Sequence, residues 1–136
     1  MASERDTFST PVIYTRRSPH IERLIDKFLD AACDSSRRSI LEMLIPPIGH
    51  DSPDGYELRA GEIARQLGLA PSTTSEHLRH LQRLQLLNTR KEGTAVYYRL
   101  CNHHLVQAFH ELLLALETHY QPSGTNGPKN NDKTSL

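Results

Sequence analysis

Residues 67–100 read LGLAPSTTSEHLRHLQRLQLLNTRKEGTAVYYRL. The stretch begins with small hydroxylated residues, continues through leucines at helical spacing, and ends in a basic run that contains glycine and tyrosine. In residues 71–84 the apolar side chains recur on one side of a helix and the polar side chains on the other. In residues 86–100 the period changes from 3.6 to 2, with a turn at Glu92 and Gly93. That change predicts a helix followed at once by a β-hairpin.

A short helix is predicted immediately before this one, over residues 58–68. Its inward positions are Ile63, Ala64 and Leu67, and Gly68 ends it. Pro71 then opens the next helix at a position where its missing N–H is not needed. Two short helices joined by so tight a turn are typical of a helix-turn-helix. A hairpin directly after such a motif is the wing of a winged helix.

Three further helices and loops complete the predicted domain. Residues 18–32 begin with a Ser-Pro start signal, and residues 34–45 begin with Asp34 or Ser35 as N-cap and stop at a pair of prolines. Residues 46–57 have the composition of a loop. The last helix, residues 102–120, is apolar over more than one stripe, so it needs a partner beyond the core of its own domain.

A chain of 136 residues with 37% hydrophobic residues has room for one modest core. We therefore expect an α+β winged helix with helical dimerisation elements, in the order α-α-α-α-β-β-α. The expected divisions are a flexible N-terminal tail (residues 1–18), a DNA-binding and dimerisation domain (19–120) and a disordered C-terminal tail (121–136). Because no apolar run approaches the roughly 20 residues needed to cross a bilayer, we expect a cytoplasmic protein without a membrane partner.

The formal net charge is zero, but the charges are unevenly distributed. Residues 72–100 hold five basic residues against two acidic ones, a local excess of three. The positive patch is therefore confined to the predicted second helix of the motif and its hairpin. A tight helix-turn-helix, a confined basic patch and a basic hairpin together favour DNA binding over the alternative, an amphipathic helix with a solvated polar face.

The residues expected to contact DNA follow from how grooves and phosphates are bound. The major groove accepts an α-helix, and phosphates are met by basic side chains, hydroxyls and helix N-termini. We expect Ser72 and Thr73 to reach a phosphate, and the next polar positions to reach base edges. The wing, residues 90–94, would contact the backbone or the minor groove. The full predicted set is Ser72, Thr73, Ser75, Glu76, Arg79, Arg83, Arg90 and Lys91.

The same residues resemble the ArsR/SmtB family of bacterial winged-helix repressors. The family signature Ser-x-His-Leu stands here as residues 75–78, and the wing ending Gly-x-x-x-x-Tyr-x-Leu stands as residues 93–100. The resemblance covers about residues 20–120. It implies a homodimer with the first and last helices at the interface, a two-fold symmetric operator, and release by a metal or another signal.

The chain departs from the family pattern in three features. The helix-capping Ser before the recognition helix is Ala70 here, and the Gly that usually ends that helix is Gln85. A residue other than Gly at a position of positive φ costs about 1 kcal/mol. Where the arsenic- and lead-sensing members carry Cys-x-Cys, this chain has Arg59 and Gly61, so that metal site is absent.

The signal that would release the DNA is left open between several hypotheses. The zinc-sensing pattern would fall on Asn102, His104, Ala115 and Thr118, and of these only His104 is a zinc ligand. A divalent metal on Cys101, His104 or His110 is one hypothesis, and a redox switch between Cys33 and Cys101 is another. An unrecognised small-molecule effector, or none, is the third. No cofactor is therefore expected with certainty.

These observations predict a homodimeric DNA-binding transcriptional regulator, a repressor, with double-stranded DNA as its partner. The alternative from another class is a winged-helix module that binds a protein and has lost DNA binding. An enzyme is not expected, because the sequence carries no Ser/His/Asp set, paired carboxylates, P-loop or dinucleotide signature.

Overall fold

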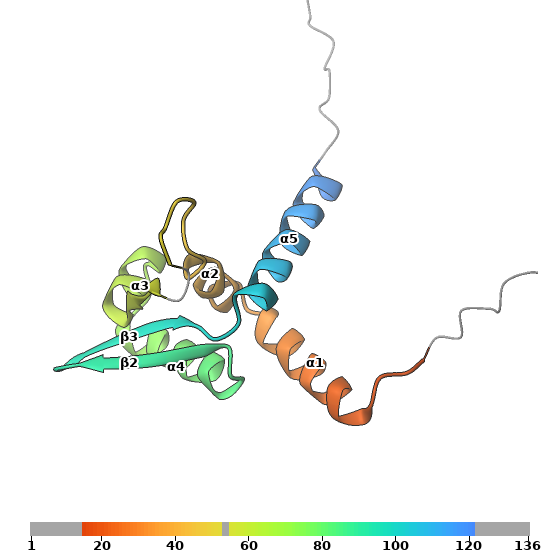
Figure 1. Cartoon of the computed structure of the whole chain (residues 1–136), viewed down its shortest axis with the longest axis horizontal. Helices are drawn as coiled ribbons and strands as arrows, with labels where there is room; N and C mark the ends of the chain where they lie inside the picture. The colour runs from red at the N-terminus through yellow and green to blue at the C-terminus, as the bar shows by residue number, and fades with distance from the viewer. Residues whose placement is uncertain (1–14, 53–54, 122–136) are drawn as a thin grey trace, which may run out of the picture.

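The computed structural model describes residues 15–52 and 55–121. Its elements are α1 (Pro19–Ala32), α2 (Ser35–Met43), β1 (Leu58–Arg59), α3 (Ala60–Leu67), α4 (Pro71–Arg83), β2 (Leu87–Glu92), β3 (Ala95–Leu100) and α5 (His103–Tyr120) (Figure 1). This order confirms the predicted winged helix-turn-helix. The predicted tails lie outside the described residues, except for residues 15–18 and 121.

Both of the first two helices begin at a side-chain cap. The Ser18 hydroxyl accepts a hydrogen bond from the N–H of Ile21 at 3.3 Å, and Pro19 fills the first helical position. Of the two N-caps predicted for α2, the structure selects Asp34, whose carboxylate accepts from the N–H of Arg37 at 2.9 Å. Helix α2 ends at Met43, slightly before the predicted stop at the prolines.

The two helices of the helix-turn-helix end in the same hydrogen-bonded motif. At the end of α3, the N–H groups of Gly68 and Leu69 donate to the carbonyls of Arg65 and Ala64. At the end of α4, the N–H groups of the corresponding residues 85 and 86 donate to the carbonyls of residues 82 and 81. This is the Schellman arrangement, which requires one residue of positive φ. Gly68 has φ +66° and Gln85 has φ +58°, which confirms that Gln85 occupies the strained position.

The sheet has three antiparallel strands in the order β1-β3-β2. Strands β2 and β3 form the predicted hairpin, with Arg90 opposite Tyr97 and Lys91 opposite Val96. Strand β1 was not predicted. The helix expected over residues 58–68 begins only at Ala60, because Leu58 and Arg59 pair with Tyr98 and Tyr97 of β3.

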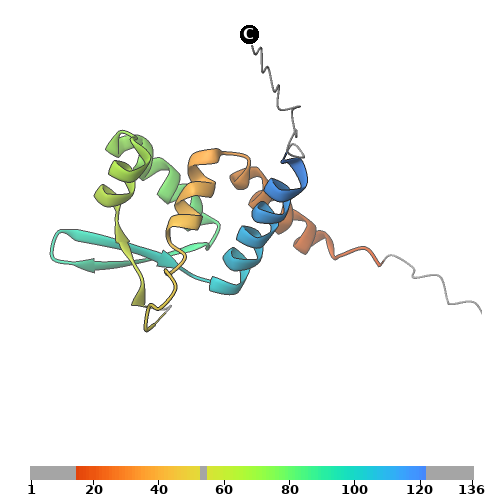
Figure 2. The same ribbon diagram turned by 90° about the horizontal axis from the view of Figure 1, so that it is seen from above.

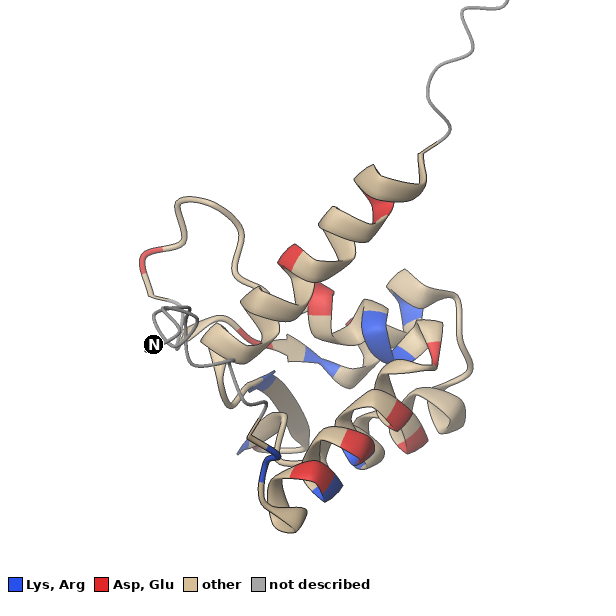
Figure 3. Ribbon diagram, turned by 90° about the vertical axis from the view of Figure 1, so that its right-hand side faces the viewer, with Lys and Arg blue, Asp and Glu red and all other residues tan. Residues whose placement is uncertain are grey.

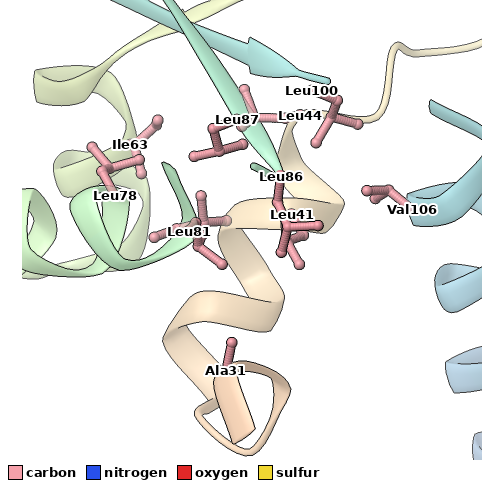
Figure 4. Close-up of a cluster of buried hydrophobic side chains, with 11 residues drawn as sticks. Ala31, Leu41, Leu44, Ile63, Leu78, Leu81, Leu86, Leu87, Leu100 and Val106 are labelled. Atoms are coloured by element: carbon pink, nitrogen blue, oxygen red, sulfur yellow. The ribbon is translucent and has the colours of Figure 1, made fainter. Parts of the chain in front are cut away.

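The core lies where α2, α3, α4, the hairpin and α5 meet (Figure 4). Leucines dominate it, and the predicted inward residue Ile63 is fully buried. Burying one such side chain stabilises the fold by about 1.5–3 kcal/mol relative to leaving it exposed. The labelled side chains of this cluster are Ala31, Leu41, Leu44, Ile63, Leu78, Leu81, Leu86, Leu87, Leu100 and Val106. The core therefore holds α4 against the base of the wing.

Helices α1 and α5 extend away from the wing, on the opposite side of the domain (Figures 1 and 2). Near their base the rings of Phe28 and Phe109 stand edge to face, 5.2 Å apart. His110 on α5 is 3.0 Å from a carboxylate oxygen of Glu42 on α2. Beyond these contacts both helices expose large apolar side chains. Among the helices of residues 15–52 and 55–121, none combines the length and apolarity that crossing a bilayer requires.

Candidate nucleic-acid interface

One side of α4 is fixed to the core. Leu78 and Leu81 are completely buried, and Thr74 is 1% exposed. The Thr74 hydroxyl donates to the carbonyl of Ala70 at 3.1 Å, which ties the first turn of the helix to the preceding residue. His77 is mostly buried on this side, with its Nδ1 atom 4.0 Å from a carboxylate oxygen of Asp34. The helix is therefore held in one rotational setting about its axis.

The opposite side of α4 faces solvent. All six helix residues of the predicted DNA-binding set are exposed in the structure: Ser72, Thr73, Ser75, Glu76, Arg79 and Arg83. Because the buried side is fixed by leucines, these side chains project together from a rigid element. A rigid, polar helix face with two arginines has the size and chemistry that fit a major groove.

The N-terminal end of α4 is open to an anion. Its N-cap residue is Ala70, and the described structure shows no side-chain hydrogen bond capping the helix there. Pro71 at the first position has no N–H to donate. The N–H groups of Ser72 and Thr73 belong to the first turn, whose donors have no partners within a helix. Together with the two hydroxyls they make this end suited to a phosphate oxygen.

Of the two predicted wing residues, Arg90 is engaged within the protein. Its Nε atom lies 2.9 and 3.2 Å from the two carboxylate oxygens of Glu57, and its Nη2 atom lies 2.5 Å from one of them. Its Nη1 atom donates to Glu92 at 2.7 Å. Its guanidinium also lies over the ring of Tyr97, 4.5 Å from the centroid. Lys91, by contrast, is exposed near the turn.

The Tyr97 ring is shared by two arginines from neighbouring strands. The Arg59 guanidinium lies 5.1 Å from its centroid, and the Nε and Nη2 atoms of Arg59 donate to the Tyr97 hydroxyl at 3.1 and 2.8 Å. Arg59, Tyr97 and Arg90 are direct cross-strand neighbours on β1, β3 and β2. Hydrogen bonding to Arg90 lowers the pKa of Glu57, and the two carboxylates raise the pKa of Arg90. Glu57 was not predicted at the wing, because only strand β1 brings it there. Tyr97 lies opposite Arg90 on the predicted hairpin itself, but its contact with Arg90 was not predicted.

The residues predicted for metal or redox sensing lie on several elements: Cys33 follows α1, Cys101 follows β3, and His104 and His110 are on α5. In residues 15–52 and 55–121 no three His, Cys, Asp or Glu side chains are grouped as metal ligands. His104 lines a cavity with His50 and His103, whereas His110 contacts Glu42. Cys33 and Cys101 are both free, exposed thiols. Partial burial raises the pKa of Cys101, which lowers its thiolate fraction at neutral pH.

Comparison with known proteins places this geometry among transcription regulators. The model of the IclR helix-turn-helix domain matches residues 50–91. The transcriptional activator HlyU of Vibrio cholerae is 39% identical over 85 residues, which are 62% of this chain and 69% of HlyU. The regulator KmtR of Mycobacterium tuberculosis is 39% identical over 51 residues, and the match spans only 39% of KmtR.

Solved structures show the same fold. The structure of reduced HlyU from Vibrio cholerae aligns with a TM-score of 0.57 and 35% identity, covering 71% of this chain and 92% of HlyU. The homodimeric winged helix-turn-helix DNA-binding domain of Mb0332 from Mycobacterium bovis, a possible ArsR-family regulator, aligns with a TM-score of 0.63 at 23% identity. That match covers 79% of this chain and 91% of the Mb0332 domain.

Proposed function

Because this chain belongs to the winged-helix transcriptional regulators of the ArsR/SmtB-like kind and is a DNA-binding regulator, we propose that it acts as a homodimeric repressor of a two-fold symmetric operator. The observation that carries the proposal is the exposed polar face of α4 beside a basic wing. In this proposal residues 19–120 form one DNA-binding and dimerisation domain.

Each part of the interface is assigned one role. Helix α4 enters the major groove, where Ser75, Glu76 and Arg79 meet base edges. Its open N-terminus, with Ser72 and Thr73, binds a phosphate, and Arg83 at the other end binds the backbone. The wing lies over the adjacent backbone or minor groove. Lys91 supplies its main phosphate contact, because the guanidinium of Arg90 already pairs with two carboxylates.

The dimer is proposed to form through α1 and α5. Their large exposed apolar residues include Leu24 and Leu29 on α1, and Leu112, Leu114 and Leu116 on α5, which are between 43% and 53% exposed. Figure 3 shows charges of both signs along α1 but only acidic residues on α5. Burial of apolar surface, rather than charge pairing, is therefore the expected driving force. Because both helices extend away from the wing, a dimer formed through them would leave the exposed face of α4 accessible to DNA.

Repression is the simplest consequence of this arrangement, since a dimer that covers promoter DNA excludes other proteins from the same bases. The relative HlyU is described as a transcriptional activator. BigR of Xylella fastidiosa, which shares the fold, is described as a transcriptional repressor. A reporter under the bound promoter distinguishes the two directions: loss of this protein should raise expression.

The experiment that tests DNA binding is fluorescence anisotropy of the reduced, metal-free protein on labelled DNA from upstream of its own gene. Unlabelled unrelated duplex serves as competitor, and the salt concentration is varied. Binding that resists competitor and weakens steeply with salt supports the proposal. If the affinity for this DNA is no higher than for the competitor, the measurement is repeated with promoter fragments from across the genome. The same result for all of them would instead support a winged helix that binds a protein.

A further inference from the structure

The carboxylate of Glu57 offers Arg90 the same contact that a DNA phosphate would offer. A guanidinium binds carboxylates and phosphates through the same pair of parallel N–H donors. In the structure the Arg90 guanidinium donates three hydrogen bonds to Glu57 and one to Glu92. This group of three side chains therefore carries one more negative charge than positive charge. Within the basic stretch of residues 72–100, the charge of Arg90 is already neutralised before any DNA arrives.

The two carboxylates differ in how firmly they are placed. The Glu57 side chain is 18% exposed and comes from the residue just before β1, 33 positions away in sequence. Glu92 is 68% exposed and lies two residues along the same strand, beside the turn. The Arg90 side chain remains 44% exposed. Glu57 is thus the less exposed of the two acceptors, while part of the Arg90 side chain remains in contact with solvent.

The stack on Tyr97 keeps that guanidinium available for exchange. The Tyr97 hydroxyl accepts two hydrogen bonds from Arg59, so the ring is held from the side of β1. Arg90 lies over this ring, 4.5 Å from its centroid, so its guanidinium has a contact besides those to the carboxylates. Because 44% of the Arg90 side chain is exposed and a phosphate offers the same pair of acceptor oxygens, a phosphate can replace the carboxylate.

We propose that Glu57 is a built-in competitor for DNA phosphate at the wing: it holds Arg90 in the free protein and surrenders it to the backbone when DNA binds. In this role Glu57 lowers the affinity for all duplexes alike and does not contribute to sequence recognition. This inference rests on the proposed role of the wing. It goes beyond that role because it assigns an inhibitory function to an acidic residue outside the basic stretch.

The test compares wild type with Glu57→Gln, which keeps the shape of the side chain and one acceptor oxygen but removes its charge. The probe is a labelled duplex of random sequence, because backbone contacts do not depend on sequence. Affinity is measured over a range of salt concentrations. We expect Glu57→Gln to bind about two- to fivefold more tightly at moderate salt, with a plot of log affinity against log salt steeper by up to about 0.9. In wild type the Glu57 carboxylate that releases Arg90 attracts a cation, which offsets the cation released from the phosphate, whereas the variant has no such carboxylate.

Two controls separate this effect from a general change in charge or stability. Asp51→Asn, in the exposed loop between α2 and β1, alters net charge equally and should leave the salt slope unchanged. In an Arg90→Ala background, Glu57→Gln should no longer steepen the salt slope, because the guanidinium for which Glu57 and the phosphate compete is gone. Urea unfolding of each variant reports any loss of fold.

The outcomes are distinguishable. If wild type binds the duplex and Glu57→Gln binds equally or more weakly with an unchanged slope, Glu57 only stabilises the structure of the wing and the inference is wrong. If the gain persists without Arg90, it arises from bulk charge and the inference is also wrong. If no variant binds any duplex, the proposed DNA-binding role of the wing fails together with it.

Discussion

Gly68 and Gln85 hold the same left-handed backbone conformation, with φ of +66° and +58°, at the ends of the two helices of the helix-turn-helix. Both positions complete a Schellman motif with the same pair of hydrogen bonds. At Gly68 this conformation is free of side-chain strain, whereas at Gln85 the Cβ atom makes it costly. The recognition helix α4 therefore ends at a strained residue, directly before Leu86 and Leu87 enter the core.

Replacing Gln85 with glycine should relieve that strain. We expect Gln85→Gly to raise the free energy of unfolding by about 0.5–1 kcal/mol, measured by urea denaturation. The matched change is Gly68→Gln, which should lower it by about 1 kcal/mol. A Cβ atom at Gly68 would meet nothing within 4 Å, so this loss reports backbone strain and not a clash. Destabilisation by Gln85→Gly would mean that contacts of the Gln85 side chain outweigh the strain.

Charge on the exposed apolar face of α5 should separate the proposed dimer. Leu112 is 52% exposed, so Leu112→Glu should fold normally and yet shift the protein from dimer to monomer, because an unpaired carboxylate would be buried at the interface. Sedimentation equilibrium measures the mass. Ile48→Glu places the same charge on a fully exposed loop residue and should leave the mass unchanged. A wild-type protein that sediments as a monomer at high concentration would contradict the dimer.

The N-cap of α2 should give the fold a measurable acid sensitivity. The hydrogen bond from the N–H of Arg37 lowers the pKa of Asp34 below its ordinary value of 3.8. A carboxyl group whose pKa is lowered by folding contributes stability above that ordinary value, and the contribution disappears as the pH falls through the lowered value. The variant Asp34→Asn keeps a capping oxygen without the charge.

Wild type should therefore exceed Asp34→Asn in unfolding free energy at pH 7, and this difference should shrink steadily below about pH 4. Urea denaturation at a series of pH values measures it. Asp51→Asn removes an exposed carboxylate that caps no helix and should show no such trend. A difference between wild type and Asp34→Asn that stays constant down to pH 2.5 would exclude the capping carboxylate as its source.

The sequence was sufficient to predict the elements whose signals are local. The Ser-Pro start of α1, the glycine after α3 and the alternating pattern of the hairpin each lie within a few residues of what they determine. Strand β1 was missed because two residues cannot display an alternating pattern, and only pairing with β3 defines them as a strand. The exposed face of α4 was predicted because burial of its leucines fixes the other face.

The pairing of Arg90 within the wing could not be predicted in the same way. Arg90 and Lys91 are adjacent basic residues beside one turn, and strand alternation places them on opposite faces of the hairpin. What each face contacts cannot be read from this local pattern. Their difference arises from Tyr97, which lies opposite Arg90 in the hairpin, and from Glu57, which reaches Arg90 only because β1 pairs with β3. Side chains that meet across a sheet depend on register, and register depends on tertiary packing.

The central claim is that α4 reads bases while the wing holds the backbone. The most direct measurement is the affinity of Arg79→Ala and Lys91→Ala, each for the operator and for a random duplex, over a range of salt concentrations. Arg79→Ala should lose about 1–3 kcal/mol on the operator and little on random DNA, whereas Lys91→Ala should weaken both equally and reduce the salt slope by about one. A loss of sequence preference in Lys91→Ala together with a uniform loss in Arg79→Ala would contradict the account.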